Sequence, residues 1–508
     1  MAKRVLFGAL ALLLFSVGSA SAQVICPLSG ASSAKLVCLL PQVYGPWGLN
    51  ASTNSIPSDL LTNGHQGHFQ DAFLTSFGPI NDAVGIQVSQ LPLASPSSGI
   101  SFIYDTALKT FTPSTDESLG PILGERASTI GRNKLFVGFS YQYFNFSSVD
   151  GHDLNNIPAV FQHMSVPVPN GDGLPACSNQ TALSTTEPCV VRDFIQTTTS
   201  ISLKVNQYSI YATYGITRHM DISVAIPILN VRMGVVSNAT IVPNSVAPAS
   251  GFPGTPYPSN AWHQFNPILP QCTAQNKGTV AEGACLNVTF NNSGTATGIG
   301  DVTFRYKYKL YDGERAGFAF GADIRVPTGD AQNFLGSGST GVKPFGVFSY
   351  RSRVSPHAEV GYEVNGGSIL AGDFIGSSAA GAKGAMPNRF IYVVGADAYL
   401  VKRLTAAFDI YGQRLFSAPE LVSRPATDLG NCAGPTDSTG AQCGTYTPGT
   451  SHPNFTGTTA DYNITNASLG LKFRPFRNLV ITGNVLLKLD SGGLRSKAVP
   501  LVGVSYNF

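Results

Sequence analysis

The chain has few charged residues: Asp, Glu, Lys and Arg make up 12% of its 508 residues, about half the share of roughly 25% in globular proteins. The formal net charge is only +3, so the composition does not predict binding to nucleic acid or to a partner recruited by charge. Beyond residue 22 no stretch approaches the roughly 18 to 20 uninterrupted apolar residues that a membrane-spanning helix needs. These absences exclude a helical membrane protein and leave several soluble domains or one large barrel with an appendage.

Motifs of common hydrolases are also missing. No G-x-S-x-G or H-E-x-x-H occurs, which disfavours a serine hydrolase and a zinc protease. His65 and His68, in "HQGH", could chelate a metal, but two histidines in a polar loop are more often solvated. "GSGSTG" (Gly336–Gly341) has the glycine spacing of a dinucleotide loop, but Pro327 and Pro344 do not fit the strand and helix that should flank it. We predict no enzyme, no cofactor and no metal.

The first residues have the pattern of a secretory signal. "MAKRVLFGALALLLFSVGSASAQ" places two cations before an apolar run and ends in a small-x-small cleavage pattern at Ala20–Ala22. We predict a signal peptide at residues 1–22 and export of the rest. No lipobox-like Leu-x-x-Cys precedes Cys26, so we expect a free N-terminus near Gln23 rather than a lipid anchor.

The few cysteines fall into four local pairs. They are Cys26 with Cys38, Cys177 with Cys189, Cys272 with Cys285, and Cys432 with Cys443. Loop-closure entropy favours pairing within each group, so we predict four disulfides formed after export, each contributing about 3 kcal/mol. Their spacing and the lack of nearby histidines disfavour zinc.

Much of the chain alternates apolar and polar residues, which is typical of strands. In "DVTFRYKYKL" every second residue from Val302 to Leu310 is apolar, whereas Arg305, Lys307 and Lys309 lie between them. Similar runs predict strands near 135–146, 199–215, 219–233, 302–310, 316–326, 343–351, 357–365, 388–400, 404–415, 462–473, 479–489 and 498–508. The apolar parity changes near Gln207, where we expect a bulge.

The connections between these strands alternate between short turns and long loops at 147–198, 234–297, 328–342, 366–387 and 416–461. Strands of this length and this alternation are typical of an outer-membrane barrel, with the long loops outside. We predict an all-β fold, an antiparallel transmembrane β-barrel of about 12 strands (12–14) over residues 134–508. Residues 23–133 do not fit the pattern and are predicted to form a plug or a periplasmic segment.

The chain ends in "VPLVGVSYNF", in which Val502, Val504, Tyr506 and Phe508 alternate with other residues. This terminus resembles the assembly signal of bacterial outer-membrane barrels. The resemblance implies recognition by the barrel-assembly machinery of a Gram-negative bacterium and a final position in the outer-membrane lipid bilayer.

Several stretches resemble one family. They are "YGITRHMDISVAIPI" (Tyr214–Ile228), "GIGDVTFRYKY" (Gly298–Tyr308), "VPTGD" followed by "FLGSGST", and "LKFRPFRNLVITGNVLLKL" with the terminal strand. Together they resemble the Gram-negative outer-membrane barrels of the MetA-pathway phenol-degradation family, which are distantly similar to long-chain fatty-acid and toluene transporters. The resemblance covers roughly residues 200–508 and implies a transporter-like barrel. "GSGSTG" then becomes part of a loop between two strands, where glycines serve turn geometry.

If the apolar positions face lipid, the polar positions face the lumen. The predicted lumen-lining residues are Lys204, Arg305, Lys307, Lys309, Asp323, Arg325, Glu359, Glu363, Asp397, Asp409 and Lys472. They could line a pathway for a small hydrophobic or aromatic solute, or they could form a network that holds a plug and braces the wall. The alternatives to a channel are a structural or adhesive barrel with disulfide-clamped outer loops and, less favoured, an outer-membrane hydrolase.

Overall fold

The computed structural model of the protein describes residues 26, 34–44, 51–53, 70–93, 102–105, 110–113, 118–162, 193–242, 244, 263–265, 272, 285–373, 382–428, 430, 447–476 and 478–508. The predicted signal peptide, His65, His68 and the pairs Cys177/Cys189 and Cys432/Cys443 lie outside these residues. Within them, no helix is both long and apolar enough to cross a membrane.

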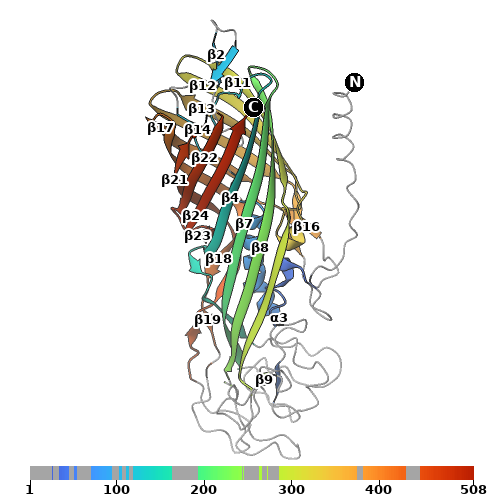
Figure 1. Ribbon diagram of the computed structural model, residues 1–508. Coiled ribbons are helices and arrows are strands. Elements are labelled where there is room, and N and C mark those ends of the chain that lie inside the picture. The colour runs from blue at the N-terminus through green and yellow to red at the C-terminus, as the bar shows by residue number, and fades with distance from the viewer. Residues whose placement is uncertain are drawn as a thin grey trace, which may run out of the picture.

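Twelve antiparallel strands close into a barrel (Figure 1). In chain order they are β4 (Leu135–Val149), β7 (Phe194–Gly215), β8 (Met220–Val242), β11 (Val302–Asp312), β12 (Ala316–Val326), β13 (Gly341–Tyr350), β14 (Val354–Asn365), β17 (Arg389–Val401), β18 (Leu404–Ser423), β21 (Phe455–Phe473), β22 (Leu479–Lys488) and β24 (Ala498–Asn507). Each strand pairs with the next along this series, and β24 pairs with β4 to close the barrel. The predicted all-β barrel is therefore confirmed.

The structure also contains shorter strands and helices. Strands β5 (His152–Asp153), β6 (Ile157–Gln162), β10 (Asn287–Ile299) and β23 (Leu494–Ser496) join the barrel sheet, and four two-stranded ladders pair β1 (Ala51–Thr53) with β9 (His263–Phe265), β2 (Phe102–Asp105) with β3 (Thr110–Pro113), β15 (Gly367–Asp373) with β16 (Ala382–Ala385), and β19 (Ala426–Thr427) with β20 (Ser451–His452). Among the described residues the helices are α3 (Gln70–Val88) and the single 3₁₀ turns η1 (Leu36–Cys38) and η4 (Ala331–Asn333).

A bulge separates β10 from β11, and both strands pair with the same edge of β8. The β10 ladder ends with Ile299 opposite Ile228, and the β11 ladder starts with Thr303 opposite Ala225. The three residues Gly300–Val302 therefore lie opposite only two residues of β8, Ile226 and Pro227, as in a β-bulge. The extra residue brings the Asp301 side chain into the barrel, where it is buried.

The outer wall carries a belt of exposed apolar and aromatic side chains. We call this set the apolar belt, and its members include Phe139, Tyr208, Ile210, Ile222, Phe304, Phe318, Phe320, Ile324, Val360, Phe408, Leu469, Ile481, Val502 and Val504. Inward positions on the same strands are mostly polar or small. This distribution is the reverse of a soluble protein and is that of a barrel surrounded by lipid.

Strand β7 changes polarity without changing register. Its pairing with β8 is continuous along the whole strand, so the bulge predicted near Gln207 is absent and that prediction was wrong. Odd-numbered residues are buried all along β7. They are apolar from Ile201 to Val205 and mostly polar from Gln207 to Thr213, whereas the outward residues become apolar at Tyr208. The change of parity therefore marks the edge of the apolar belt.

The same inversion continues on the neighbouring strands. On β8, Ile228 faces outward within the belt, but Asn230 and Arg232 face outward beyond it, and Leu229 and Val231 beneath them are buried. Strands β7, β8 and β10 thus continue past the apolar belt toward the end of the molecule where β9 (His263–Phe265) and β19 (Ala426–Thr427) lie (Figure 1). We call these parts the outer extension. Its inner face is apolar because it packs on other parts of the chain, and its outer face is polar because it meets water.

The first part of the chain packs inside the outer extension. The Tyr44 ring contacts Phe77 of α3, Phe161 of β6 and Phe290 of β10, with ring centroids 5.1–6.4 Å apart. Its hydroxyl lies 2.9 Å from the Ser237 hydroxyl. These contacts join the N-terminal segment to three strands of the barrel sheet.

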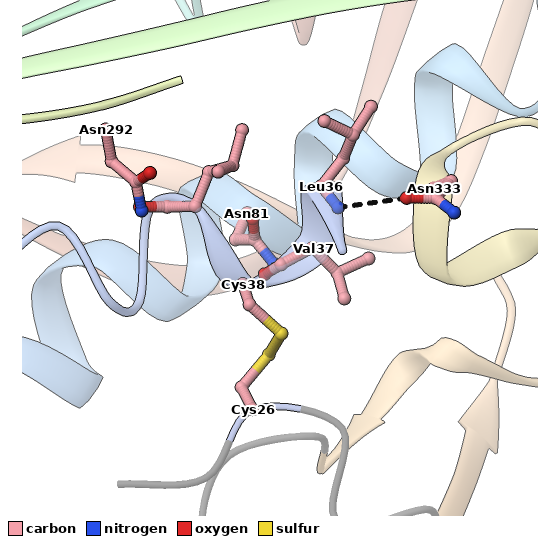
Figure 2. The surroundings of a disulfide bond; sticks show 8 residues. Cys26, Leu36, Val37, Cys38, Asn81, Asn292 and Asn333 are labelled. Carbon is pink, nitrogen blue, oxygen red and sulfur yellow. Dashed lines mark hydrogen bonds between the residues drawn. A yellow bond between two sulfur atoms is a disulfide. The ribbon is translucent and has the colours of Figure 1, made fainter. Parts of the chain in front are cut away.

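A disulfide fixes η1 to this core (Figure 2). Cys26 and Cys38 are bonded, and so are Cys272 and Cys285, as predicted. Beside Cys38, the Asn81 side-chain amide of α3 donates to the Val37 carbonyl at 3.1 Å, and the Leu36 amide donates to the Asn333 side chain at 3.2 Å. The turn is therefore held by both α3 and the loop between β12 and β13.

Candidate functional site

The lumen at the end with the short turns is crossed by residues 118–130, which we call the lumen segment. The Leu119 amide donates to the Thr405 hydroxyl at 2.9 Å on one side of the barrel. On the other side the Ile130 amide donates to an Asp221 carboxylate oxygen at 3.0 Å. Nearly all side chains of the segment are buried. The segment therefore spans the barrel interior and leads into β4.

Glu125 anchors the lumen segment to β11. Its Oε1 lies 2.6 Å from Arg305 Nη1, and its Oε2 lies 3.0 Å from Lys307 Nζ. Arg305 also makes a two-pronged contact with Asp323 at 2.6 and 2.7 Å. Glu125 is only 1% exposed, so its charge is compensated by these two cations rather than by water.

A second anchor is formed by Arg126 with residues of the three neighbouring strands β14, β17 and β18. Arg126 Nη2 lies 2.6 Å from Asp397 Oδ2 on β17. His357 of β14 lies between Asp397 and Asp409, with its Nδ1 3.3 Å from an Asp397 oxygen and its Nε2 2.6 Å from an Asp409 oxygen. The Leu123 amide points to the other oxygen of Asp409 at 3.4 Å. Both carboxylates thus face the lumen segment.

Lys472 on β21 provides a third anchor. Its Nζ donates to the carbonyl oxygens of Pro121 at 2.5 Å and Leu119 at 3.3 Å. The Ala127 amide donates to the Ser349 hydroxyl of β13 at 3.2 Å. The lumen segment is therefore attached to strands around much of the barrel circumference.

Further into the barrel, the charged side chains form a continuous wall. Arg325 Nη2 lies 3.0 Å from Glu363 Oε1, and Arg389 Nη2 lies 2.6 Å from the other oxygen of Glu363. Lys343 Nζ joins Asp323 at 3.0 Å to Glu359 at 3.3 Å. With Arg305 and Asp301, these residues make up the charged wall.

The glycine-rich stretch lies against this wall rather than around a phosphate. The Ser337 amide donates to Asp301 Oδ2 at 2.8 Å, and Arg325 donates to the Ser337 hydroxyl and to the Ser339 carbonyl. A Cβ on Gly336 would lie 2.7 Å from the Gly329 Cα. Glycine is required because two parts of the loop between β12 and β13, at Gly329 and Gly336, approach closely inside the barrel.

A cavity of about 150 Å³ lies between the charged wall and the N-terminal segment. Leu91 and Pro92, which follow α3, line it on one side and Leu123 of the lumen segment lines it on another. Leu229, Leu335 and Tyr411 add further apolar surface. One wall of the cavity is thus charged, and the others are mainly apolar.

Ten of the eleven side chains predicted to line the lumen occupy inward positions: Arg305, Lys307, Lys309, Asp323, Arg325, Glu359, Glu363, Asp397, Asp409 and Lys472. Lys309 lies nearest the turns and pairs with Asp312 at 2.6 Å.

Lys204 is a correction: its side chain is exposed on the outer face of β7. The inward expectation is wrong because Leu203 and Val205 do not face lipid: in the outer extension apolar residues face the core, so Lys204 between them faces outward.

Several interior residues were missed from the sequence. Lys343, His357 and Arg389 lie at inward positions of predicted strands, and strict alternation could have identified them. Glu125 and Arg126 lie in a segment with no strand or helix periodicity. No sequence signal indicated that they would meet the barrel charges.

The closed barrel, its apolar belt and its polar interior define the fold class of an outer-membrane β-barrel. Residues 199–400 match the protein family described as "Putative MetA-pathway of phenol degradation". The family resemblance expected from the sequence is thus confirmed. No curated protein sequence matches the chain.

Solved structures of outer-membrane barrels resemble this fold. An outer-membrane channel from Pseudomonas putida F1 is 9% identical with a TM-score of 0.37, and the match covers 76% of this chain and 99% of that one. A Pseudomonas aeruginosa FadL homologue is 8% identical with a TM-score of 0.29, covering 81% and 96%. A deletion mutant of the monoaromatic hydrocarbon channel TodX is 10% identical with a TM-score of 0.23, covering 82% and 99%.

Proposed function

We propose that the protein is exported to the bacterial outer membrane and serves there as a gated channel for small, mainly apolar or aromatic molecules. The observation that carries this proposal is the cavity of about 150 Å³ inside the barrel. Leu123 of the lumen segment and Leu91 after α3 both line it, so two separate stretches of the N-terminal part of the chain contribute to its surface. Residues 23–133 would act as the gate.

The size and chemistry of the cavity support a small neutral solute. A cavity of roughly 150 Å³ in another protein holds one benzene molecule. The charged wall contains four cations and four carboxylates, which are Arg305, Arg325, Lys343, Arg389, Asp301, Asp323, Glu359 and Glu363. Each makes an ion pair within the protein, so the wall has no excess charge with which to select an ion.

The lumen charges serve mainly to hold the gate closed. Arg305, Lys307, Asp397 and Lys472 all contact the lumen segment, and opening the lumen requires these contacts to break. A passing solute would supply part of that free energy by its contacts in the cavity, because a ligand shifts an equilibrium only through its differential affinity for the two states.

Filling the cavity should block uptake. Leu123→Trp places an indole ring in the space that the Leu123 side chain now lines. Leu135→Trp makes the same substitution on the outer wall, where the Leu135 side chain is 37% exposed. We expect cells that carry Leu123→Trp to take up radiolabelled toluene no faster than cells without the protein. Leu135→Trp should leave uptake unchanged.

The comparison requires equal amounts of each folded variant in the outer membrane. Wild-type rates of toluene uptake in Leu123→Trp cells would count against a solute path through the cavity. If deletion of the protein changed surface attachment but not uptake, the adhesive alternative would be favoured instead.

A further inference from the structure

Two cations lie side by side on the outside of the barrel, just beyond the apolar belt. Lys204 of β7 and Arg232 of β8 are directly opposed partners in the antiparallel ladder, and both side chains are exposed. Like charges in directly opposed positions destabilise a sheet unless an anion compensates them. Within the described part of the chain, neither residue makes an ion pair.

Arg232 is held in place by a chain of amide contacts. Its Nε donates to Asn230 Oδ1 at 3.1 Å, and Asn230 Nδ2 donates to the Thr297 hydroxyl at 2.7 Å. Asn206 Nδ2 donates to the same Asn230 oxygen at 3.2 Å, and the Tyr141 hydroxyl donates to Asn206 at 2.8 Å. The two Nη nitrogens of Arg232 have no acceptor among the described residues. The guanidinium is therefore oriented with its strongest donors available.

The position of this pair relative to lipid is fixed by the strand register. Tyr208, Ile228 and Ile299 form one cross-strand row of the apolar belt. Lys204 lies four residues further along β7 than Tyr208, which is about 13 Å along a strand. A strand tilted by about 40° rises about 10 Å over this length, and the Lys and Arg side chains reach back toward the lipid surface. The pair therefore reaches the headgroup zone of the leaflet that faces the long loops.

One other exposed cation on the outside of the barrel is neutralised by a carboxylate. Arg414 of β18 lies 3.5 Å from Asp461 of β21, so that pair carries no net charge. The surface around Lys204 and Arg232 offers hydroxyl and amide groups instead, including Thr295, which is the register partner of Arg232 on β10. A cationic pair surrounded by neutral donors suits a phosphate on a sugar.

We propose that Lys204 and Arg232 form a binding site for a phosphorylated glycolipid of the outer leaflet. The phosphate would bridge Lys204 Nζ and the Nη groups of Arg232, the sugar would contact the Asn and Thr side chains, and the acyl chains would lie on the apolar belt. This site is separate from the lumen and does not depend on which solute the channel carries.

Binding titrations of the refolded full-length protein in detergent test this site. The probes are diphosphorylated lipid A, the same lipid without its phosphates, and inorganic phosphate. Each Lys or Arg near an anionic lipid surface strengthens binding to it about fivefold. We therefore expect Lys204→Gln/Arg232→Gln to bind diphosphorylated lipid A about 30-fold more weakly than the wild type. The control is Arg353→Gln/Lys402→Gln, which removes two exposed cations from the short turns at the opposite end and should bind like the wild type.

The proposal fails if the Lys204/Arg232 variant binds diphosphorylated lipid A as tightly as the wild type. It also fails if the control variant loses as much affinity for this lipid as the Lys204/Arg232 variant does. It also fails if the dephosphorylated lipid binds equally well, since the phosphate would then contribute nothing. Equal binding of inorganic phosphate at the same concentration would indicate a simple anion site and would overturn recognition of the lipid.

Discussion

Replacing Glu125 by Ala should destabilise the protein by about 3–5 kcal/mol, which is the cost of leaving buried charges without their partner. Glu125 is buried and meets two cations, Arg305 at 2.6 Å and Lys307 at 3.0 Å. Lys307 is itself only 2% exposed, so water cannot replace the lost carboxylate. Chemical denaturation of the refolded protein in detergent measures the change in the free energy of unfolding.

The matched control is Asp330→Ala. Asp330 pairs with Lys35 at 3.0 Å, but both side chains are about two-fifths exposed, at 41% and 39%. Exposed pairs contribute at most about 1 kcal/mol, and Asp330 also caps η4 by accepting from the Gln332 amide, which contributes about 1 kcal/mol, so this variant should lose at most about 2 kcal/mol. Equal losses for Glu125→Ala and Asp330→Ala would show that the lumen segment contributes little to stability.

Reversing the charge of both cations that bind Glu125 should open the barrel. In Arg305→Glu/Lys307→Glu, four carboxylates would meet where Glu125 and Asp323 now meet two cations, and like charges in a low-dielectric interior repel strongly. We expect the lumen segment to leave its position and a steady, cation-selective conductance to appear in planar bilayers.

The control for this prediction carries the same change of charge on the outer wall. Lys204→Glu/Arg232→Glu alters two exposed cations that face away from the lumen, and it should remain non-conducting. If both double variants were silent, the charges on β11 would not determine whether the lumen is closed. Conductance in both would mean that net charge, rather than the contact with Glu125, controls opening.

The barrel could be predicted from the sequence because lipid imposes a simple rule on its strands. From Val302 to Leu310 every second side chain is apolar, and the same residues face outward in the structure. The rule fails where a strand leaves the lipid. On β7 the outward face becomes polar beyond Tyr208, and the pattern then resembles a shifted register. Lys204 was misplaced for this reason.

The interior could be predicted only in part. Asp323 and Glu363 follow from alternation along their strands, but their partners depend on how a segment without periodicity folds. Glu125 and Arg126 are neighbours in sequence, yet they bind strands that are four apart in the barrel, Arg305 on β11 and Asp397 on β17. Such contacts between residues about 180–270 positions apart are set by the closed barrel, and local patterns do not encode them.

The central claim is that the N-terminal part of the chain closes the lumen, and planar-bilayer conductance tests it most directly. The measurement compares the intact protein with a barrel that begins at Gly131 and therefore lacks the lumen segment. The account predicts a silent intact protein and steady conductance from the shortened barrel. Steady conductance from the intact protein would contradict the claim, because residues 118–130 would then leave an aqueous pore open.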